Sequence, residues 1–193
     1  MNYTKTFTPD QVQQYKARRA AKDKLITTNK YDKWFDTRWI GDPGEDTVES
    51  MLQDWYGMEK NQGYTRYTND SDYDYKDFTI PHKKCSLVID VKTQGRNGKP
   101  ETYYSYDVAE KQYVKITTRY KQPGNINTLI FCSYDKTTNT CTAIGYLTVP
   151  QFVKQAEFRK KGSIMGALTL STNGYFIPAS KLTPFINKRG FLM

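Results

Sequence analysis

Histidine and cysteine are scarce in this chain, which excludes several kinds of catalytic and metal site. The sequence has 1 His, at position 82, and 3 Cys, at positions 85, 132 and 141. A site that needs two imidazole groups is therefore excluded, and an odd number of cysteines without a CxxC pair is neither a disulfide framework nor a zinc knuckle. His82 is interpreted as a turn residue after Pro81, with a nucleophilic pair of Cys85 and His82 as the less favoured alternative.

Long hydrophobic runs are also missing. The longest apolar stretches, 128–132 and 143–149, are far shorter than the roughly 20 residues that cross a bilayer. Residues 1–10 lack the continuous apolar stretch of a secretory signal. We therefore expect a soluble protein without a membrane partner, located in the cytoplasm. The bias towards Lys, Asn, Thr and Tyr is typical of an AT-rich genome, and in a phage-encoded protein this would be the host cytoplasm.

The chain does have a marked excess of positive charge. Its 193 residues include 29 Lys and Arg against 20 Asp and Glu, which gives a net charge of +9. A cationic surface of this size attracts polyanions through counterion release, so nucleic acid is the first candidate partner. The alternative is that the charge only keeps the protein in solution. The mean hydropathy of −0.78 is low, but 16 Tyr, 9 Phe and 3 Trp supply large side chains for a core.

Helix and strand signals alternate along the chain, and its length fits one domain, 1–193. Thr8, Pro9 and Gln11 form a helix start signal, and Asp42, Pro43 and Gly44 form a similar one. These patterns predict an α/β fold with a central mixed β-sheet flanked by helices. The expected helices are 9–26, 43–57, 104–120 and 150–160, with a turn at Ser180; the expected strands are 64–68, 77–80, 85–93, 128–134, 141–149 and 175–177.

Two acidic residues and a lysine are placed where their side chains can converge. The segment Ser86–Lys92 is apolar until Asp90 and Lys92, which are two residues apart and so lie on one face of a strand. Asp77 begins the preceding strand, close enough along the chain for the two strands to be neighbours. Phosphodiester hydrolysis uses a divalent ion, for which aspartate oxygens are suitable ligands, and a lysine can stabilise the charged phosphate. The pattern therefore predicts a nuclease site with Mg²⁺ or Mn²⁺.

Asp77 followed by Ile89-Asp90-Val91-Lys92 at the end of an apolar strand resembles the signature of the PD-(D/E)xK, or restriction-endonuclease-like, nucleases. The resemblance implies a restriction-endonuclease-like core over about 43–149, with a basic helix at 9–26 and a C-terminal elaboration at 150–193. It also implies that Asp77 and Asp90 bind the metal and that Lys92 is catalytic. That superfamily has a helix with a Glu before the first motif strand, and Glu49 matches this position, which implies that it is an auxiliary metal ligand of the catalytic site. The carbonyl of Val91 would be a further ligand.

The sequence departs from the family pattern in two places. Lys76 stands where the signature has proline, and no Gln-x-x-x-Tyr motif of the RecB-like exonuclease branch follows Lys92. A second DxK, Asp74-Tyr75-Lys76, does not end an apolar strand. If the strand before Pro81 is shifted, Asp74 or Asp72 would replace Asp77 as the first ligand.

The preferred interpretation is a Mg²⁺-dependent deoxyribonuclease of the restriction-like, junction-resolving or phage DNA-processing kind, acting alone or as a homodimer. One alternative is a non-catalytic nucleic-acid-binding protein, in which tyrosines such as Tyr64 and Tyr67 would stack on unpaired bases. Another is a structural or inhibitory protein that binds an acidic partner. In the nuclease, the residues expected to contact DNA are Lys83, Lys84, Gln94, Arg96, Lys99, Arg18 and Arg19.

Overall fold

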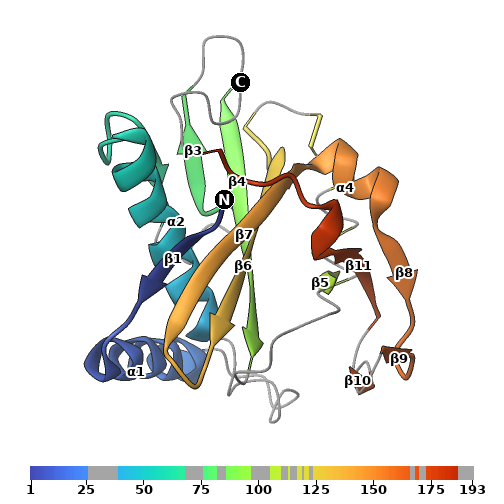
Figure 1. Cartoon of the computed structure of the whole chain (residues 1–193), viewed down its shortest axis with the longest axis horizontal. Coiled ribbons are helices and arrows are strands. Elements are labelled where there is room, and N and C mark those ends of the chain that lie inside the picture. The colour runs from blue at the N-terminus through green and yellow to red at the C-terminus, as the bar shows by residue number, and fades with distance from the viewer. Residues whose placement is uncertain are drawn as a thin grey trace.

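The computed structural model describes residues 1–25, 39–67, 76–81, 86–96, 105–109, 113, 117–118, 120–121, 124–165, 168–169 and 173–186. A six-stranded sheet lies at the centre, with strand order β1-β7-β6-β4-β3-β2 (Figure 1). β4 and β6 pair in parallel and their other neighbours are antiparallel, so the sheet is mixed. Its strands are β1 (Tyr3–Thr6), β2 (Thr65–Arg66), β3 (Phe78–Ile80), β4 (Leu87–Arg96), β6 (Thr128–Asp135) and β7 (Thr140–Thr148).

Two long helices lie on one side of this sheet. α1 (Pro9–Leu25) begins at the predicted capping box, in which Gln11 N donates to Thr8 Oγ1 and Thr8 N donates to Gln11 Oε1. α2 (Gly41–Tyr56) buries Val48 and other apolar side chains against the strands and ends at Gly57 in the left-handed conformation. The predicted start of α2 is wrong in detail, because Ile40 is its N-cap residue and Asp42 lies inside the first turn.

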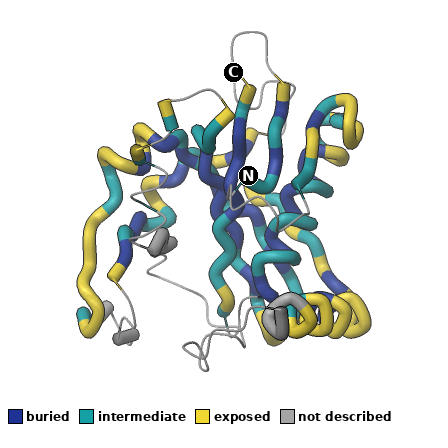
Figure 2. Tube along the Cα trace, turned by 180° about the vertical axis from the view of Figure 1, so that it is seen from behind, coloured by how far each residue is buried: buried dark blue, intermediate teal, exposed yellow. Residues whose placement is uncertain are grey.

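The other face of the sheet is covered by a second layer from the C-terminal part of the chain. Leu129 and Phe131 of β6 pack there with Phe152 and Ile177 in one hydrophobic cluster. Figure 2 shows the buried segments concentrated in the central sheet and the inner surfaces of its covering layers. The second layer contains α4 (Val149–Gln155), a three-stranded sheet of β5 (Ser105–Ala109), β11 (Gly174–Pro178) and β8 (Glu157–Arg159), the hairpin of β9 (Ile164–Met165) and β10 (Leu168–Thr169), and η2 (Ala179–Lys181).

The structure confirms the α/β class and the mixed sheet, corrects two predicted helices and adds one strand. The predicted helix 104–120 is wrong at 105–109, which form β5 because they pair with β11, a partner that is distant in sequence. The helix expected at 150–160 ends at Gln155, and β8 follows it. β1 was not predicted at all, since it is a short edge strand whose partner is β7. None of the helices described is long and apolar enough to span a membrane.

Candidate active site

β4 carries two of the predicted residues on one face. Asp90 is 3% exposed, although it is charged at neutral pH in its ordinary state. Lys92 lies two residues further along the strand, and its Nζ is 2.8 Å from Asp90 Oδ2. The alternation of side chains along a strand places the neighbouring Ile89 and Val91 in the core beneath α2 instead. The middle of β4, where its buried half ends, therefore holds a close ion pair.

Asp77 joins this pair from the adjacent strand. β3 begins at Phe78, opposite Ile89, and Asp77 N still donates to Ile89 O at 2.8 Å. Beyond this point β4 has no ladder partner on that side among the described strands. The carboxylate of Asp77 takes the place of a ladder acceptor, since its Oδ2 accepts a hydrogen bond of 2.6 Å from Val91 N. Because Asp77 directly precedes β3, its carboxylate lies at the backbone of Val91, between Asp90 and Lys92.

Burial shifts the ionisation of both aspartates, and Asp90 also acts on Asp77. Burial raises the pKa of Asp77 well above its usual range, and the negative charges of Glu45 and Asp90 raise it further. The Val91 N–H and the Lys92 ammonium act in the opposite direction. Burial also raises the pKa of Asp90, while Lys92 lowers it. Two carboxylates in one desolvated place repel each other, and a bound cation would stabilise both in their charged form.

Helix α2 carries a glutamate that was not predicted as part of this site. Glu45 is the acidic side chain of α2 whose charge raises the pKa of Asp77. The pKa of Glu45 is itself raised to about 7, first by burial and then by Asp42 and Asp46, against the opposing effect of Arg66. Glu45 precedes Glu49 by one helical turn on the same face, and sequence spacing alone could not decide which of the two lies beside Asp77.

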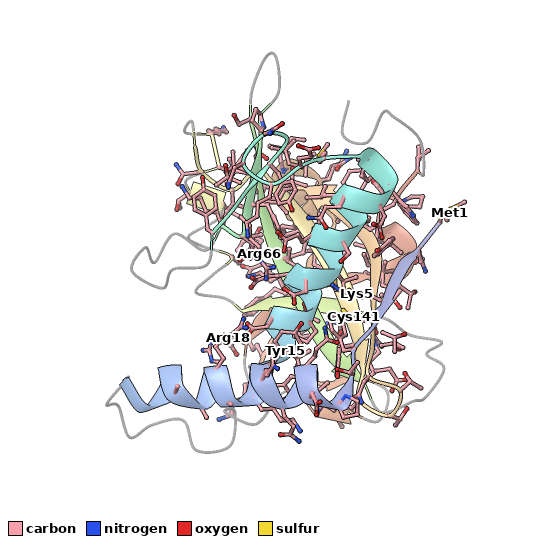
Figure 3. The ribbon with its side chains drawn as sticks, turned by 90° about the vertical axis from the view of Figure 1, so that its left-hand side faces the viewer. Met1, Lys5, Tyr15, Arg18, Arg66 and Cys141 are labelled. Carbon is pink, nitrogen blue, oxygen red and sulfur yellow. The ribbon has the colours of Figure 1, made fainter. Side chains whose placement is uncertain are left out.

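The carboxylate of the predicted Glu49 interacts with three other side chains. Its Oε2 is 2.5 Å from Arg66 Nη1, its Oε1 accepts a hydrogen bond of 2.9 Å from Tyr64, and Lys60 Nζ is 3.7 Å away. Arg66 also contacts Asp46 at 2.6 Å and Glu45 at 3.3 Å through Nη2. Figure 3 shows Arg66 alongside α2, where it joins the acidic face of this helix to β2.

The remaining predicted residues lie at varying distances from the pair of aspartates. Gln94 and Arg96 continue the face of β4 that carries Asp90, and Gln94 Oε1 is buried without a hydrogen-bond partner among the described residues. Arg18 and Arg19 are on α1, where Arg18 Nη1 is 3.9 Å from Asp42 at the start of α2. Figure 3 shows Arg18 on the side of α1 that faces α2. The residues that lie outside the described part are Lys83, Lys84, Lys99, Asp72, Asp74, His82 and Cys85.

Two other features bear on the alternatives. Tyr64 is 1% exposed, so its ring is not available to stack on a base. Within the described ranges, no group of three or more His, Cys, Asp or Glu side chains is arranged to hold a metal. The donors that are present are the oxygens of Asp77 and Asp90, and such hard donors fit Mg²⁺, which commonly uses one or two carboxylates and keeps several waters.

Comparison with known proteins finds a structural similarity. No protein-family model matches the chain, and no curated protein sequence matches it significantly. Among solved structures the chain is similar to Hjc, a Holliday junction resolvase from the archaeal hyperthermophile Archaeoglobus fulgidus. The TM-score is 0.40 with 11% sequence identity, over 74% of this chain and 91% of that chain. A similarity of this size does not assign the chain to a family.

Proposed function

We propose that this chain is a metal-dependent nuclease that hydrolyses phosphodiester bonds of DNA. The observation that carries the proposal is the convergence of Asp77 and Asp90 across β3 and β4, with Lys92 Nζ 2.8 Å from Asp90. The raised pKa values of both aspartates indicate that their charges are poorly stabilised by the protein alone. Strongly perturbed carboxyl groups that lie close together are typical of functional sites.

Each residue of the site has a role in this proposal. Asp77 and Asp90 would hold Mg²⁺ or Mn²⁺, and the Val91 carbonyl would be a further ligand because the backbone there contacts Asp77. A divalent ion bound there would neutralise charge on the phosphate and polarise a water molecule. Lys92 would stabilise the additional negative charge that develops on the phosphate during attack. Of the two α2 glutamates, Glu45 is better placed than Glu49 to assist.

The surrounding polar residues would hold the DNA backbone. Gln94 and Arg96 follow Lys92 along the same face of β4, so they would contact phosphates next to the one that is cleaved. Contacts to phosphate fix position and orientation without reading sequence. Further contacts are proposed for Arg18, Arg19, Lys83, Lys84 and Lys99.

The decisive experiment is a cleavage assay on labelled single-stranded, duplex and branched DNA with Mg²⁺, Mn²⁺ or EDTA. We expect wild-type protein to cut at least one substrate only with metal, and Asp90→Asn and Lys92→Met to lose at least about a hundredfold in rate. Asp54→Asn and Lys60→Met are matched controls, because these side chains lie away from the aspartate pair and should leave cleavage unchanged. DNA binding without cleavage, equal in all variants, would contradict the proposal and favour a non-catalytic binding protein.

A further inference from the structure

Positive charge is concentrated in the C-terminal part of the chain. Residues 150–193 contain 7 Lys and Arg but only 1 acidic residue, a net charge of +6. Residues 1–149 contain the other 22 basic and 19 acidic residues, a net charge of +3. Of these 7 basic residues, 5 lie in the described part of the segment, on α4, β8, the turn after β8 and η2, and they attract a polyanion to this region: Lys154, Arg159, Lys160, Lys161 and Lys181.

This layer lies on the face of the central sheet that carries the site. In the parallel pairing of β4 with β6, Asp90 is opposite Leu129 and Lys92 is opposite Phe131, so these side chains share one face. Leu129 and Phe131 belong to the cluster that Ile177 of β11 completes. A DNA strand that reaches Asp90 and Lys92 from this side therefore approaches the C-terminal layer.

A row of three aromatic rings lies in this layer and ends in an exposed phenylalanine. Tyr113 and Tyr175 are stacked, with ring centroids 3.4 Å apart and an interplanar angle of 7°. Phe158 is the cross-strand partner of Tyr175, and their ring centroids are 5.2 Å apart. Phe158 is 40% exposed, one of the few large apolar side chains of the described part that are open to solvent. The ring of Tyr175 packs against the ring of Phe158.

Lysines follow this exposed ring directly along the chain. Lys160 and Lys161 come immediately after β8, and both are exposed. Their turn is held in place, since Ser163 N donates to Lys160 O at 3.0 Å and Lys161 N donates to Asn173 Oδ1 at 2.8 Å. Lys154 on the preceding helix α4 is exposed as well, and none of these three lysines forms an ion pair among the described residues. By contrast, Arg159 is paired with Glu157.

We propose that Phe158, Lys154, Lys160 and Lys161 form a binding surface for DNA with unpaired bases. A base stacks on the exposed face of Phe158, and the flanking phosphates contact the lysines, as in other proteins that bind single strands without sequence preference. The acidic side chains of α2 carry the same negative charge as DNA. They repel a DNA strand, which therefore approaches the C-terminal layer instead. This inference rests on the proposed function only in taking DNA as the ligand.

Binding is tested separately from cleavage. All variants are made in the Asp90→Asn background, and fluorescence anisotropy with a labelled oligothymidine and with a duplex of equal length is measured in EDTA at several salt concentrations. We expect Phe158→Ala to weaken binding of the single strand about tenfold. Binding of the duplex should change less than about twofold, because its bases are already stacked. Phe158→Trp, which keeps an aromatic face, should bind the single strand at least as well as the parent.

The lysines are tested through the salt dependence. Lys160→Ser and Lys161→Ser together should reduce the slope of log affinity against log salt by roughly one unit for each phosphate that a lysine no longer neutralises. Lys60→Ser and Ile186→Ala are controls for removal of an exposed charge and of an exposed apolar side chain elsewhere, and neither should change binding. Absence of single-strand binding, equal losses in Phe158→Ala and Phe158→Trp, or losses no larger than in the controls would each overturn the inference. Because no cleavage is measured, failure of the nuclease proposal would not affect this result.

Discussion

The carboxyl group of Glu45 on helix α2 acts on Asp77 through its charge. Burial and the neighbouring acids Asp42 and Asp46 raise its pKa to about 7 in the folded protein, above the ordinary value of 4.5. The folded state therefore binds a proton at Glu45 more tightly than the unfolded state does. The resulting stabilisation is fully present below about pH 4.5 and is lost as the pH rises towards 7.

Replacing Glu45 by Gln removes this dependence, since glutamine does not ionise. Between pH 4.5 and 7, the free energy of unfolding of Glu45→Gln should rise relative to that of the wild type by about 1 to 2 kcal/mol and then level off. Urea unfolding at half-unit pH intervals from 4 to 8 measures this difference. If the two proteins show parallel profiles over that range, Glu45 does not have a raised pKa in the folded state.

The residues of the site differ in how far the sequence alone identifies them. Asp90 and Lys92 follow from a local pattern, because a two-residue spacing at the end of an apolar strand places both side chains on one face. Asp77 follows from its short separation from this strand. The choice between Glu45 and Glu49 depends on how far α2 extends along the sheet and on the position of Arg66, and neither is encoded in the spacing of α2 itself.

At the scale of elements, α2 packs against β4, the strand that carries Asp90 and Lys92 of the candidate site. Gly44 makes this close contact possible. A Cβ atom at position 44 would lie 1.8 Å from Thr93 Oγ1 and 3.0 Å from Thr93 Cβ. Gly41, three residues earlier in the same helix, has no atom within 4 Å of the corresponding position. The two glycines therefore form a matched pair for testing the helix–strand contact.

Gly44→Ala should destabilise the protein by roughly 2 kcal/mol or more, because the added methyl group must push α2 away from β4. Gly41→Ala should be neutral or slightly stabilising, since alanine restricts the unfolded chain and is favoured in a helix. Adding Thr93→Ala to Gly44→Ala should recover part of the loss by removing the nearest atom. Thermal unfolding of the four proteins measures these effects. Equal stabilities for the two single glycine variants would show that α2 does not depend on this contact.

Elements formed by local interactions could be predicted from the sequence, and elements that depend on distant partners could not. β4, β6 and β7 are long and apolar or alternating, so local sequence identifies them. The capping box at Thr8 likewise identifies the start of α1. β5 was mistaken for helix because its strand state depends on pairing with β11, and β8 was mistaken for the end of a helix for the same reason.

At the scale of the whole molecule, β1 covers one edge of the central sheet. Its residues pair with Thr140–Ala143 of β7, and the N-terminal amino group donates to Phe185 O at 3.1 Å. Lys5 also donates a hydrogen bond of 2.8 Å to Ser50 on α2. β1 therefore protects the edge of β7 and also joins the sheet to α2 and to the C-terminal segment.

Removal of residues 1–7 should lower the melting temperature and promote self-association, because an uncovered strand edge can pair with another chain. The association should increase with protein concentration, and light scattering after size-exclusion chromatography measures it. Thr4→Ala, which keeps the backbone of β1 in place, serves as the control and should remain in the state of the wild type. A truncated protein that has the same mass in solution and the same melting temperature as the wild type would contradict this role for β1.

The pairing of β1 with β7 also has a consequence for biosynthesis. Tyr3 pairs with Ala143, so β1 leaves the ribosome well before its partner strand β7 has been translated. α1 and α2 can form early, but the sheet against which they pack can be completed only after β7 emerges. Because such distant contacts close slowly, we expect the nascent chain to expose apolar surface until β7 has emerged.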